Sequence, residues 1–241
     1  MNYLKQELHL YIINVEKESE RRSSASKEAE RLGLPYSIVR AVTPNDIRDI
    51  DSQLVSLGVR AVWLSHMRAH AEFIETGAAY GIIAEDDFRI MNKESVENLI
   101  HIGIDANLDY LQIGFLLPGL DTRLNVGLTN LQTIGFKLLS TLSSMPLIGR
   151  LIQSERLRIR EARGLSTRII SANSQPGAHF YLVSRRFSQK IQELNNPQYL
   201  SIDDFFSSLA RMRAFRMART MRNLVRQKNF PSWTGDRFKQ I

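Results

Sequence analysis

The stretch Tyr80-Gly81-Ile82-Ile83-Ala84-Glu85-Asp86-Asp87 decides the fold that this sequence predicts. Its first five residues are apolar enough for a short buried strand, and three acidic residues follow without a break. Side chains alternate along an extended chain, so Glu85 and Asp87 should face one way and Asp86 the other. In open α/β sheets, ligand sites lie beyond the carboxyl ends of the strands. The stretch therefore predicts a buried strand that ends in an acidic site, with an exposed acidic turn as the alternative.

Strand and helix patterns alternate along the chain on both sides of this stretch. A charged helix is expected over residues 17–32, where Gly33 would end it, and a second helix over residues 59–74 would end at Gly77. This alternation predicts the α/β class, with a mostly parallel sheet covered on both faces by helices. Further apolar or β-branched runs predict strands at residues 8–15, 36–42, 109–115 and 179–184.

The 241 residues suffice for one large α/β domain with a C-terminal extension. The domain is expected over residues 1–206, with an irregular or inserted segment at about 119–176. A basic helical extension of the same domain is expected over residues 207–241. Its helix, or helix pair, would run from Ser201 toward Lys228 and carry Arg211, Arg213, Arg216, Arg219, Arg222 and Arg226.

Composition limits the chemistry that the chain can use. It has no cysteine, which excludes disulfides, thiolate zinc sites and cysteine nucleophiles, so any metal must bind to oxygen or imidazole. It also has no Gly-rich phosphate loop and no serine-hydrolase elbow, which removes support for Rossmann-type, kinase and serine-hydrolase functions. No apolar run is long enough to span a membrane and no signal peptide is evident, which predicts a cytoplasmic protein.

Charge is divided unevenly along the chain. Residues 1–144 carry 14 Lys and Arg against 19 Asp and Glu, a net charge of −5, whereas residues 145–241 carry 18 against 6, a net charge of +12. The basic third suits an anionic partner, such as a phospholipid surface, a phosphorylated acceptor or nucleic acid. With the apolar stretch Ile134 to Ile152, it predicts peripheral attachment to an anionic membrane surface, on the inner face of the membrane. The alternative is ordinary packing and a solvated Arg-rich helix.

The acidic triplet and a pair of histidines are the candidate metal ligands. Two carboxylates on one side of a strand end make a hard-oxygen site for Mg²⁺ or Mn²⁺, which is commonly shared with substrate phosphates. His66 and His70 are four residues apart on one predicted helix, the spacing of some paired metal ligands. They share their stripe with apolar side chains, so partly buried histidines are favoured over zinc ligands.

Six short motifs in a fixed order resemble glycosyltransferase family 25, which glycosylates lipopolysaccharide and galactosylates collagen. The similarity covers most of residues 8–115 and 175–206. The motifs are Ile13-Asn14-Val15 with Arg21, Leu32-Gly33-Leu34 followed by Ala41-Val42, Leu64-Ser65-His66, Glu85-Asp86-Asp87, His179-Phe180-Tyr181-Leu182-Val183-Ser184 and Ile202-Asp203-Asp204.

This resemblance implies a GT-A-type sheet that binds a uridine-diphosphate sugar, galactose or a related hexose, with Mn²⁺ or Mg²⁺ at the acidic triplet. Asp87 would be the principal metal ligand and Glu85 the second. The acceptor would be a hydroxyl on lipopolysaccharide or another glycan, a glycolipid or a protein. The residues expected to bind the donor are Asn14, Arg21, Ser65, His66, Glu85, Asp86, His179 and Tyr181.

The family is regarded as inverting, which requires a base to deprotonate the acceptor hydroxyl. Ser201 and Asp204 are spaced like a capping box, as N-cap and third helical residue, which gives Asp204 a structural role. Asp203 is then left at the second helical position and aligns with the family's downstream Asp, so Asp203 is expected to be the catalytic base. The alternative is that Asp203 only complements the positive end of the helix.

Two other functions compete with sugar transfer. A non-enzymatic nucleic-acid-binding protein would use the Arg-rich segment, but it would leave the acidic strand end unused, and the segment lacks regularly interleaved aromatic residues. A metal-dependent phosphohydrolase would also need carboxylates at a strand end. A family member that only binds the donor is a third alternative.

Overall fold

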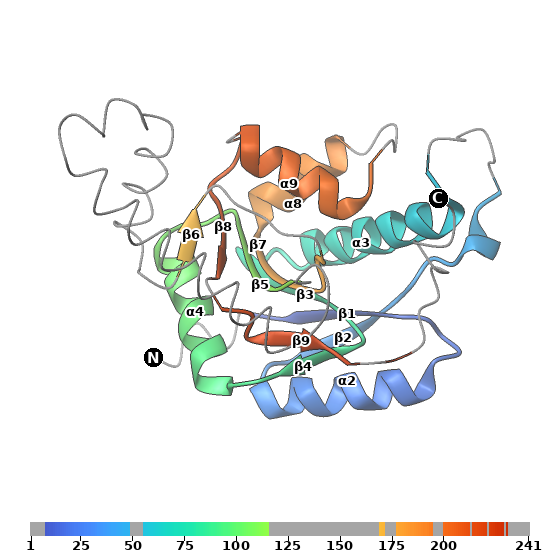
Figure 1. Ribbon diagram of the computed structural model, residues 1–241, viewed down its shortest axis with the longest axis horizontal. Coiled ribbons are helices and arrows are strands. Elements are labelled where there is room, and N and C mark those ends of the chain that lie inside the picture. The colour runs from blue at the N-terminus through green and yellow to red at the C-terminus, as the bar shows by residue number, and fades with distance from the viewer. Residues whose placement is uncertain are drawn as a thin grey trace, which may run out of the picture.

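One mixed sheet forms the centre of the computed structural model (Figure 1). The structure describes residues 8–48, 55–115, 169–171, 177–194, 200–212, 214–220, 222–228 and 230, and nine strands pair within these ranges. The strands are β1 (Leu10–Asn14), β2 (Tyr36–Arg40), β3 (Tyr80–Glu85), β4 (Phe88–Ile90), β5 (Tyr110–Gly114), β6 (Ile169–Ser171), β7 (Phe180–Ser184), β8 (Met217–Thr220) and β9 (Val225–Gln227).

The order across the sheet is β2-β1-β3-β7-β5-β8-β6, and β4 and β9 lie off this path. β1 is parallel to both β2 and β3, and β5 is parallel to both β8 and β9. β7 lies antiparallel between β3 and β5, while β4 and β6 are antiparallel to β9 and β8. Most of the strands thus share one direction, as the sequence predicts.

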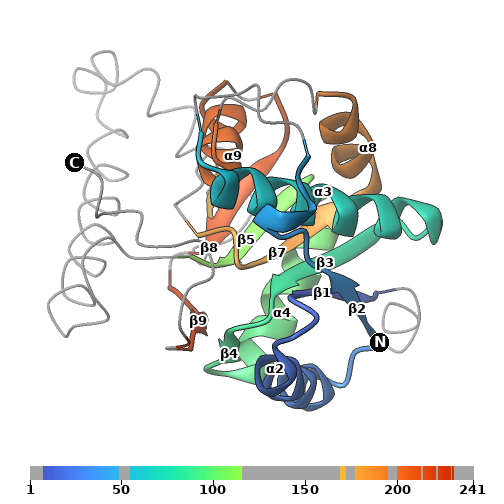
Figure 2. The same cartoon turned by 90° about the vertical axis from the view of Figure 1, so that its right-hand side faces the viewer.

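Helices cover both faces of the sheet, which confirms the predicted α/β class. Figures 1 and 2 place α3 (Leu57–Glu75), α8 (Arg185–Glu193) and α9 (Ile202–Met212) on one face. α2 (Ser19–Leu32) packs on the other face, and α4 (Lys93–Asp105) contributes to the same apolar cluster as α2. A short 3₁₀ helix, η1 (Pro44–Asp46), follows β2. Within the described residues, no helix has both the length and the apolar character needed to cross a bilayer.

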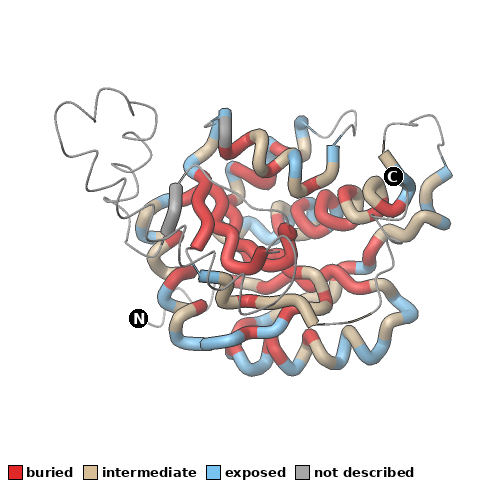
Figure 3. Tube along the Cα trace, viewed as in Figure 1, coloured by how far each residue is buried: buried red, intermediate tan, exposed pale blue. Residues whose placement is uncertain are grey.

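Strands at the centre of the sheet are buried (red in Figure 3), and the alternation along β1 shows how they contribute to two cores. Leu10 and Ile12 belong to the cluster under α2, whereas Tyr11 and Ile13 belong to the cluster under α3. All five residues of the strand are buried, because helices cover both faces. This arrangement leaves the strand ends as the places where polar side chains gather.

Both predicted glycine stops are confirmed. Gly33 follows α2 with a φ of 69°, and Gly77 follows α3 with a φ of 78°. Residues with a side chain rarely adopt this left-handed conformation, which suits glycine and ends a helix. The helices therefore end where the sequence places their stops.

The prediction of a helix from Ser201 toward Lys228 is wrong beyond Met212. Residues 217–220 and 225–227 instead form β8 and β9, which pair with β5. Arg219 on β8 is buried, and its guanidinium lies 5.4 Å from the centre of the Phe115 ring. Pairing with β5 thus outweighs the helical pattern of this Arg-rich sequence. The strand can contain Arg219 because its guanidinium packs on an aromatic ring.

Much of the segment expected to be irregular lies outside the described residues. Of residues 119–176, the structure describes only 169–171, which form β6 at the edge beside β8. The apolar stretch Ile134 to Ile152 and the basic residues 150–168 also lie outside them.

Candidate active site

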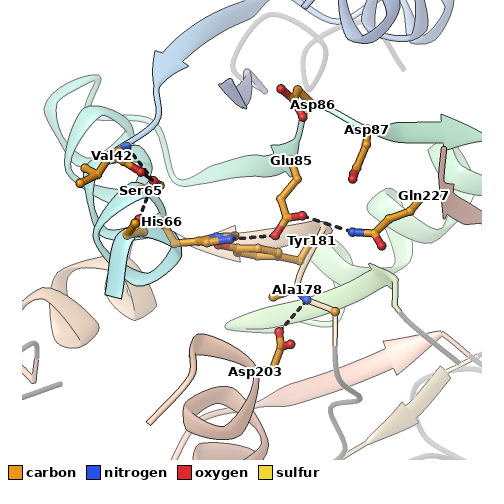
Figure 4. A network of polar contacts seen from close by, with 12 residues as sticks. Val42, Ser65, His66, Glu85, Asp86, Asp87, Ala178, Tyr181, Asp203 and Gln227 are labelled. Carbon is orange, nitrogen blue, oxygen red and sulfur yellow. Dashed lines mark hydrogen bonds and ion pairs between the residues drawn. The ribbon is translucent and has the colours of Figure 1, made fainter. Parts of the chain in front are cut away.

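The acidic triplet lies at the carboxyl end of β3, beside β1 and β7. β3 ends at Glu85, and Asp86 and Asp87 form the turn that leads into β4. Figure 4 shows Glu85 and Asp87 pointing to one side and Asp86 to the other. The predicted alternation is confirmed, and it gives the three acids different surroundings.

Asp86 is held by the end of β1 and by α2. Its Oδ2 accepts a hydrogen bond of 2.6 Å from Asn14 Nδ2, and its Oδ1 accepts one of 2.8 Å from Arg21 Nε. Burial raises the pKa of Asp86, although the charge of Arg21 and both hydrogen bonds oppose the rise. Asn14 and Arg21, which are expected to bind the donor, thus contact Asp86, so the side chain of this acid is engaged by the protein itself.

Asp87 is a partly buried carboxylate with one buried, unsatisfied oxygen. Its Oδ1 has no hydrogen-bond partner among the described residues, and its Oδ2 is 3.4 Å from Arg21 Nη2. Burial, followed by repulsion from Glu85, raises the pKa of Asp87 to about 8. A carboxylate in this position favours either a proton or a bound cation.

Glu85 is oriented from both sides. Its Oε1 lies 3.4 Å from His66 Nε2, and its Oε2 accepts a hydrogen bond of 3.2 Å from Gln227 Nε2 (Figure 4). Its side chain remains 29% exposed, so it can still meet a ligand. Gln227 is a site residue that the sequence does not predict, because residues 225–227 form β9 where a helix is expected.

His66 and Ser65 are neighbours on α3 with different roles. His66 Nδ1 is 2.8 Å from the hydroxyl of Tyr181, so the predicted residues His66, Tyr181 and Glu85 lie together. Ser65 Oγ instead accepts a hydrogen bond of 2.8 Å from Val42 N and ties α3 to the loop after β2. The structure therefore places Ser65 in a structural clamp rather than among the carboxylates.

His179 joins β7 to β3 and β9. Its carbonyl oxygen accepts from Glu85 N at 3.0 Å, and its Nε2 donates to Val225 O at 3.0 Å. Burial lowers the pKa of His179, which favours the neutral ring. Its ring packs against Gly114, where a Cβ would lie 2.6 Å from Nε2. His179 therefore helps to hold the ends of β3 and β9 in place beside the triplet.

Asp203 and Asp204 make different contacts, and Asp204 takes the predicted capping position. Ser201 Oγ accepts from Asp204 N at 3.1 Å and donates to Asp204 Oδ2 at 2.7 Å, which caps α9. Asp203 Oδ1 instead accepts from Ala178 N at 2.9 Å (Figure 4). Burial and Tyr110 raise the pKa of Tyr181, and the charges of Glu85 and Asp203 add to the rise. The charges of Glu85 and Asp203 therefore both affect Tyr181.

The segment after β9 lies against the triplet and α2. Lys228 N donates to the carbonyl oxygen of Asp87 at 2.6 Å, and Lys228 Nζ donates to Ser24 Oγ at 2.6 Å. The guanidinium of Arg21 lies 5.4 Å from the centre of the Phe230 ring. Residues far apart in the sequence thus enclose the carboxylates.

The carboxylates suit a divalent cation for which the protein supplies only some of the ligands. Within the described residues, no group of three or more His, Asp and Glu side chains is arranged to hold a metal ion. The unsatisfied oxygen of Asp87 beside Glu85 does fit a hard cation that takes its other ligands from phosphate oxygens and water.

Comparisons with known proteins find a family match for the N-terminal part of the chain. The comparison with curated proteins found no match. Among solved structures, the A197 protein from STIV is 13% identical with a TM-score of 0.45, covering 94% of this chain and 86% of its own. A glycosyltransferase involved in the glycosylation of the major capsid of PBCV-1 is 9% identical with a TM-score of 0.45, covering 94% of both chains. Residues 7–117 match the family model described as "Glycosyltransferase family 25 (LPS biosynthesis protein)". The matched residues include the acidic triplet and the strands from β1 to β5, so this part of the chain is similar to glycosyltransferase family 25.

Proposed function

We propose that this glycosyltransferase moves a hexose, galactose or a related sugar, from a UDP-sugar to an acceptor hydroxyl with the help of Mn²⁺ or Mg²⁺. The observation that carries the proposal is the unsatisfied, buried Oδ1 of Asp87 beside Glu85 at the end of β3. The acceptor would be lipopolysaccharide or another glycan, a glycolipid or a protein.

Asp87 and Glu85 would hold the cation, which neutralises charge on the departing diphosphate. Arg21 would add positive charge beside the nucleotide, since it already lies next to Asp86 and Asp87. Asn14 and Arg21 fix Asp86, so this acid would shape the donor site rather than bind the metal. The proposal therefore assigns different tasks to the three acids.

Asp203 would act as the base in an inverting transfer. It would take the proton of the acceptor hydroxyl while that oxygen bonds to the anomeric carbon of the sugar. The bond from this carbon to the diphosphate oxygen would break, and UDP would leave with its electron pair. The hydrogen bond from Ala178 N would hold the Asp203 carboxylate in place.

Thermal unfolding with a panel of nucleotide sugars, with and without Mn²⁺, tests the donor and the metal together. A ligand present at a hundred times its Kd should add about 2.7 kcal/mol of stability, because it binds only the folded state. A UDP-sugar should stabilise the wild type only with Mn²⁺, and Asp87→Asn should remove this dependence. Equal stabilisation of both proteins in excess chelator would contradict the metal assignment.

Product analysis separates transfer from its rivals. Transfer of the sugar, or slow hydrolysis of the UDP-sugar, supports the proposed reaction. Release of inorganic phosphate from simple phosphate esters would instead support a metal-dependent phosphohydrolase.

A further inference from the structure

A chain of buried polar side chains runs from Glu85 into the core beneath α8. His66 Nε2 is 3.4 Å from Glu85 Oε1, and His66 Nδ1 is 2.8 Å from the Tyr181 hydroxyl. The same hydroxyl is 3.3 Å from His70 Nε2, and His70 Nδ1 is 2.8 Å from Ser188 Oγ. The two histidines, Tyr181 and Ser188 are each at most 1% exposed, so water does not take the place of these contacts.

Counting protons gives this chain a direction. An ionised Glu85 can only accept, so His66 Nε2 must carry the proton that faces it. A neutral His66 then accepts at Nδ1, which uses the single proton of Tyr181. The oxygen of Tyr181 must therefore accept from His70 Nε2, and His70 Nδ1 accepts from the Ser188 hydroxyl. Every hydrogen bond points toward Glu85.

The opposite direction requires a charged His66. With protons on both ring nitrogens, His66 would donate to Tyr181, Tyr181 to His70 Nε2, and His70 Nδ1 to Ser188. That arrangement requires a charged, 1% exposed ring whose charge is balanced by the Glu85 carboxylate 3.4 Å away. His70 is neutral in both directions but carries its proton on different nitrogens. The tautomer of His70 therefore reports the direction of the whole chain.

We infer that Tyr181, His70 and Ser188 are positioning residues that hold His66 as a hydrogen-bond donor to Glu85. Gln227 donates to the other oxygen of Glu85, so the two contacts together fix the plane of its carboxylate. This inference rests on the proposed function in one respect, namely that Glu85 is a ligand of the metal and the donor. Residues that orient a metal ligand in this way affect affinity without touching the metal.

Histidine ¹⁵N chemical shifts of the metal-free protein test the direction. We expect a proton on Nε2 of His66 and a neutral His70 with its proton on Nε2. In Ser188→Ala, His70 should keep its proton on Nε2, because the oxygen of Tyr181 still requires a donor there. A wild-type His70 protonated on Nδ1 would overturn the inference.

Binding of Mn²⁺ in the presence of UDP tests the positioning role. Tyr181→Phe breaks the chain in the middle and should weaken binding roughly 10- to 100-fold, the usual effect of losing a partner of a metal ligand. Tyr110→Phe is the matched control. The ring of Tyr110 lies 5.2 Å from the ring of Tyr181, but Tyr110 does not belong to the chain of hydrogen bonds that starts at Glu85. It should bind like the wild type.

Ser188→Ala is a second test in case Tyr181→Phe does not fold. It should also weaken the binding of Mn²⁺, by a smaller factor. Wild-type affinity in a folded Tyr181→Phe protein, or equal losses in Tyr181→Phe and Tyr110→Phe, would overturn the inference. A wild-type protein that binds neither Mn²⁺ nor UDP would overturn the proposed function, whereas the tautomers would still decide the direction of the chain.

Discussion

Asp203 and Asp204 are adjacent, yet replacing each by asparagine should have different effects. Asp203→Asn keeps an oxygen for Ala178 N but loses the proton acceptor, so turnover should fall roughly a hundredfold or more with little change in donor affinity. Asp204→Asn weakens the contact with Ser201 and should cost about 1 kcal/mol or less. Transfer rate, donor affinity and melting temperature of both variants check this division. An active Asp203→Asn beside a folded but inactive Asp204→Asn would reverse the assignment.

The raised pKa of Asp87 predicts how the stability of the metal-free protein depends on pH. In the folded protein this pKa is about 8, above the ordinary value of 3.8. The folded state therefore keeps a proton that the unfolded chain has lost, and stability should fall as pH rises from about 4 to about 8.

Asp87→Asn should remove this dependence. The variant should exceed the wild type by at least about 1 kcal/mol at pH 8, because asparagine buries no charge beside Glu85. The difference should vanish near pH 4. Urea unfolding in excess chelator at both pH values measures it, and equal stabilities at pH 8 would show that Asp87 is not destabilising there.

At the residue scale, the sequence predicts the acids and their alternation but not all of their partners. The contrast between Asp86 and Asp87 follows from the strand period, and Asn14 and Arg21, which belong to the family motif, contact Asp86. Gln227 carries no such signal, because its contact with Glu85 joins residues 142 positions apart. Pairing at that separation depends on the fold and not on local spacing.

At the element scale, Gly114 sets the distance between β5, β7 and β9. A Cβ there would lie 2.6 Å from His179 Nε2 and 2.9 Å from the carbonyl oxygen of Val225. Gly114→Ala should therefore cost about 1–3 kcal/mol, since backbone atoms must move. Urea unfolding measures the loss, and the ¹⁵N shift of His179 should report its weakened bond to Val225.

Gly33→Ala is the contrasting control at a helix end. Its Cβ would meet nothing within 4 Å, but the φ of 69° remains, so a cost of roughly 1–2 kcal/mol should come from backbone strain alone. The ¹⁵N shift of His179 should not change. A normal His179 signal in Gly114→Ala would contradict the proposed crowding.

The elements that the sequence predicts are those with an unbroken pattern. β1, β3, β5 and β7 are fully or almost fully buried runs, and α2 and α3 end at their expected glycines. β4, β6 and β9 have three residues each, too few for a period to be recognised. β8 contains an arginine at a buried position, which a hydrophobicity pattern reads as exposed.

At the scale of the whole molecule, the basic C-terminal third leads us to propose attachment to anionic membranes on the cytoplasmic side. Arg216 and Arg222 are exposed, whereas the buried Arg219 cannot take part. The protein should sediment with anionic vesicles and be released by salt. Arg222→Ala should weaken binding about fivefold, equivalent to about 1 kcal/mol for one basic residue near the surface. Equal binding to neutral and anionic vesicles would contradict the proposal.

The contact between Gln227 and Glu85 has a consequence for the synthesis of the protein. At about 5–20 residues per second, a ribosome needs roughly 7 to 28 s to add the 142 residues that separate them. Until then the nascent chain presents Glu85 and Asp87 without β9 or Lys228. For those seconds Glu85 lacks its bond from Gln227, and Asp87 lacks the bond from Lys228 N to its carbonyl oxygen.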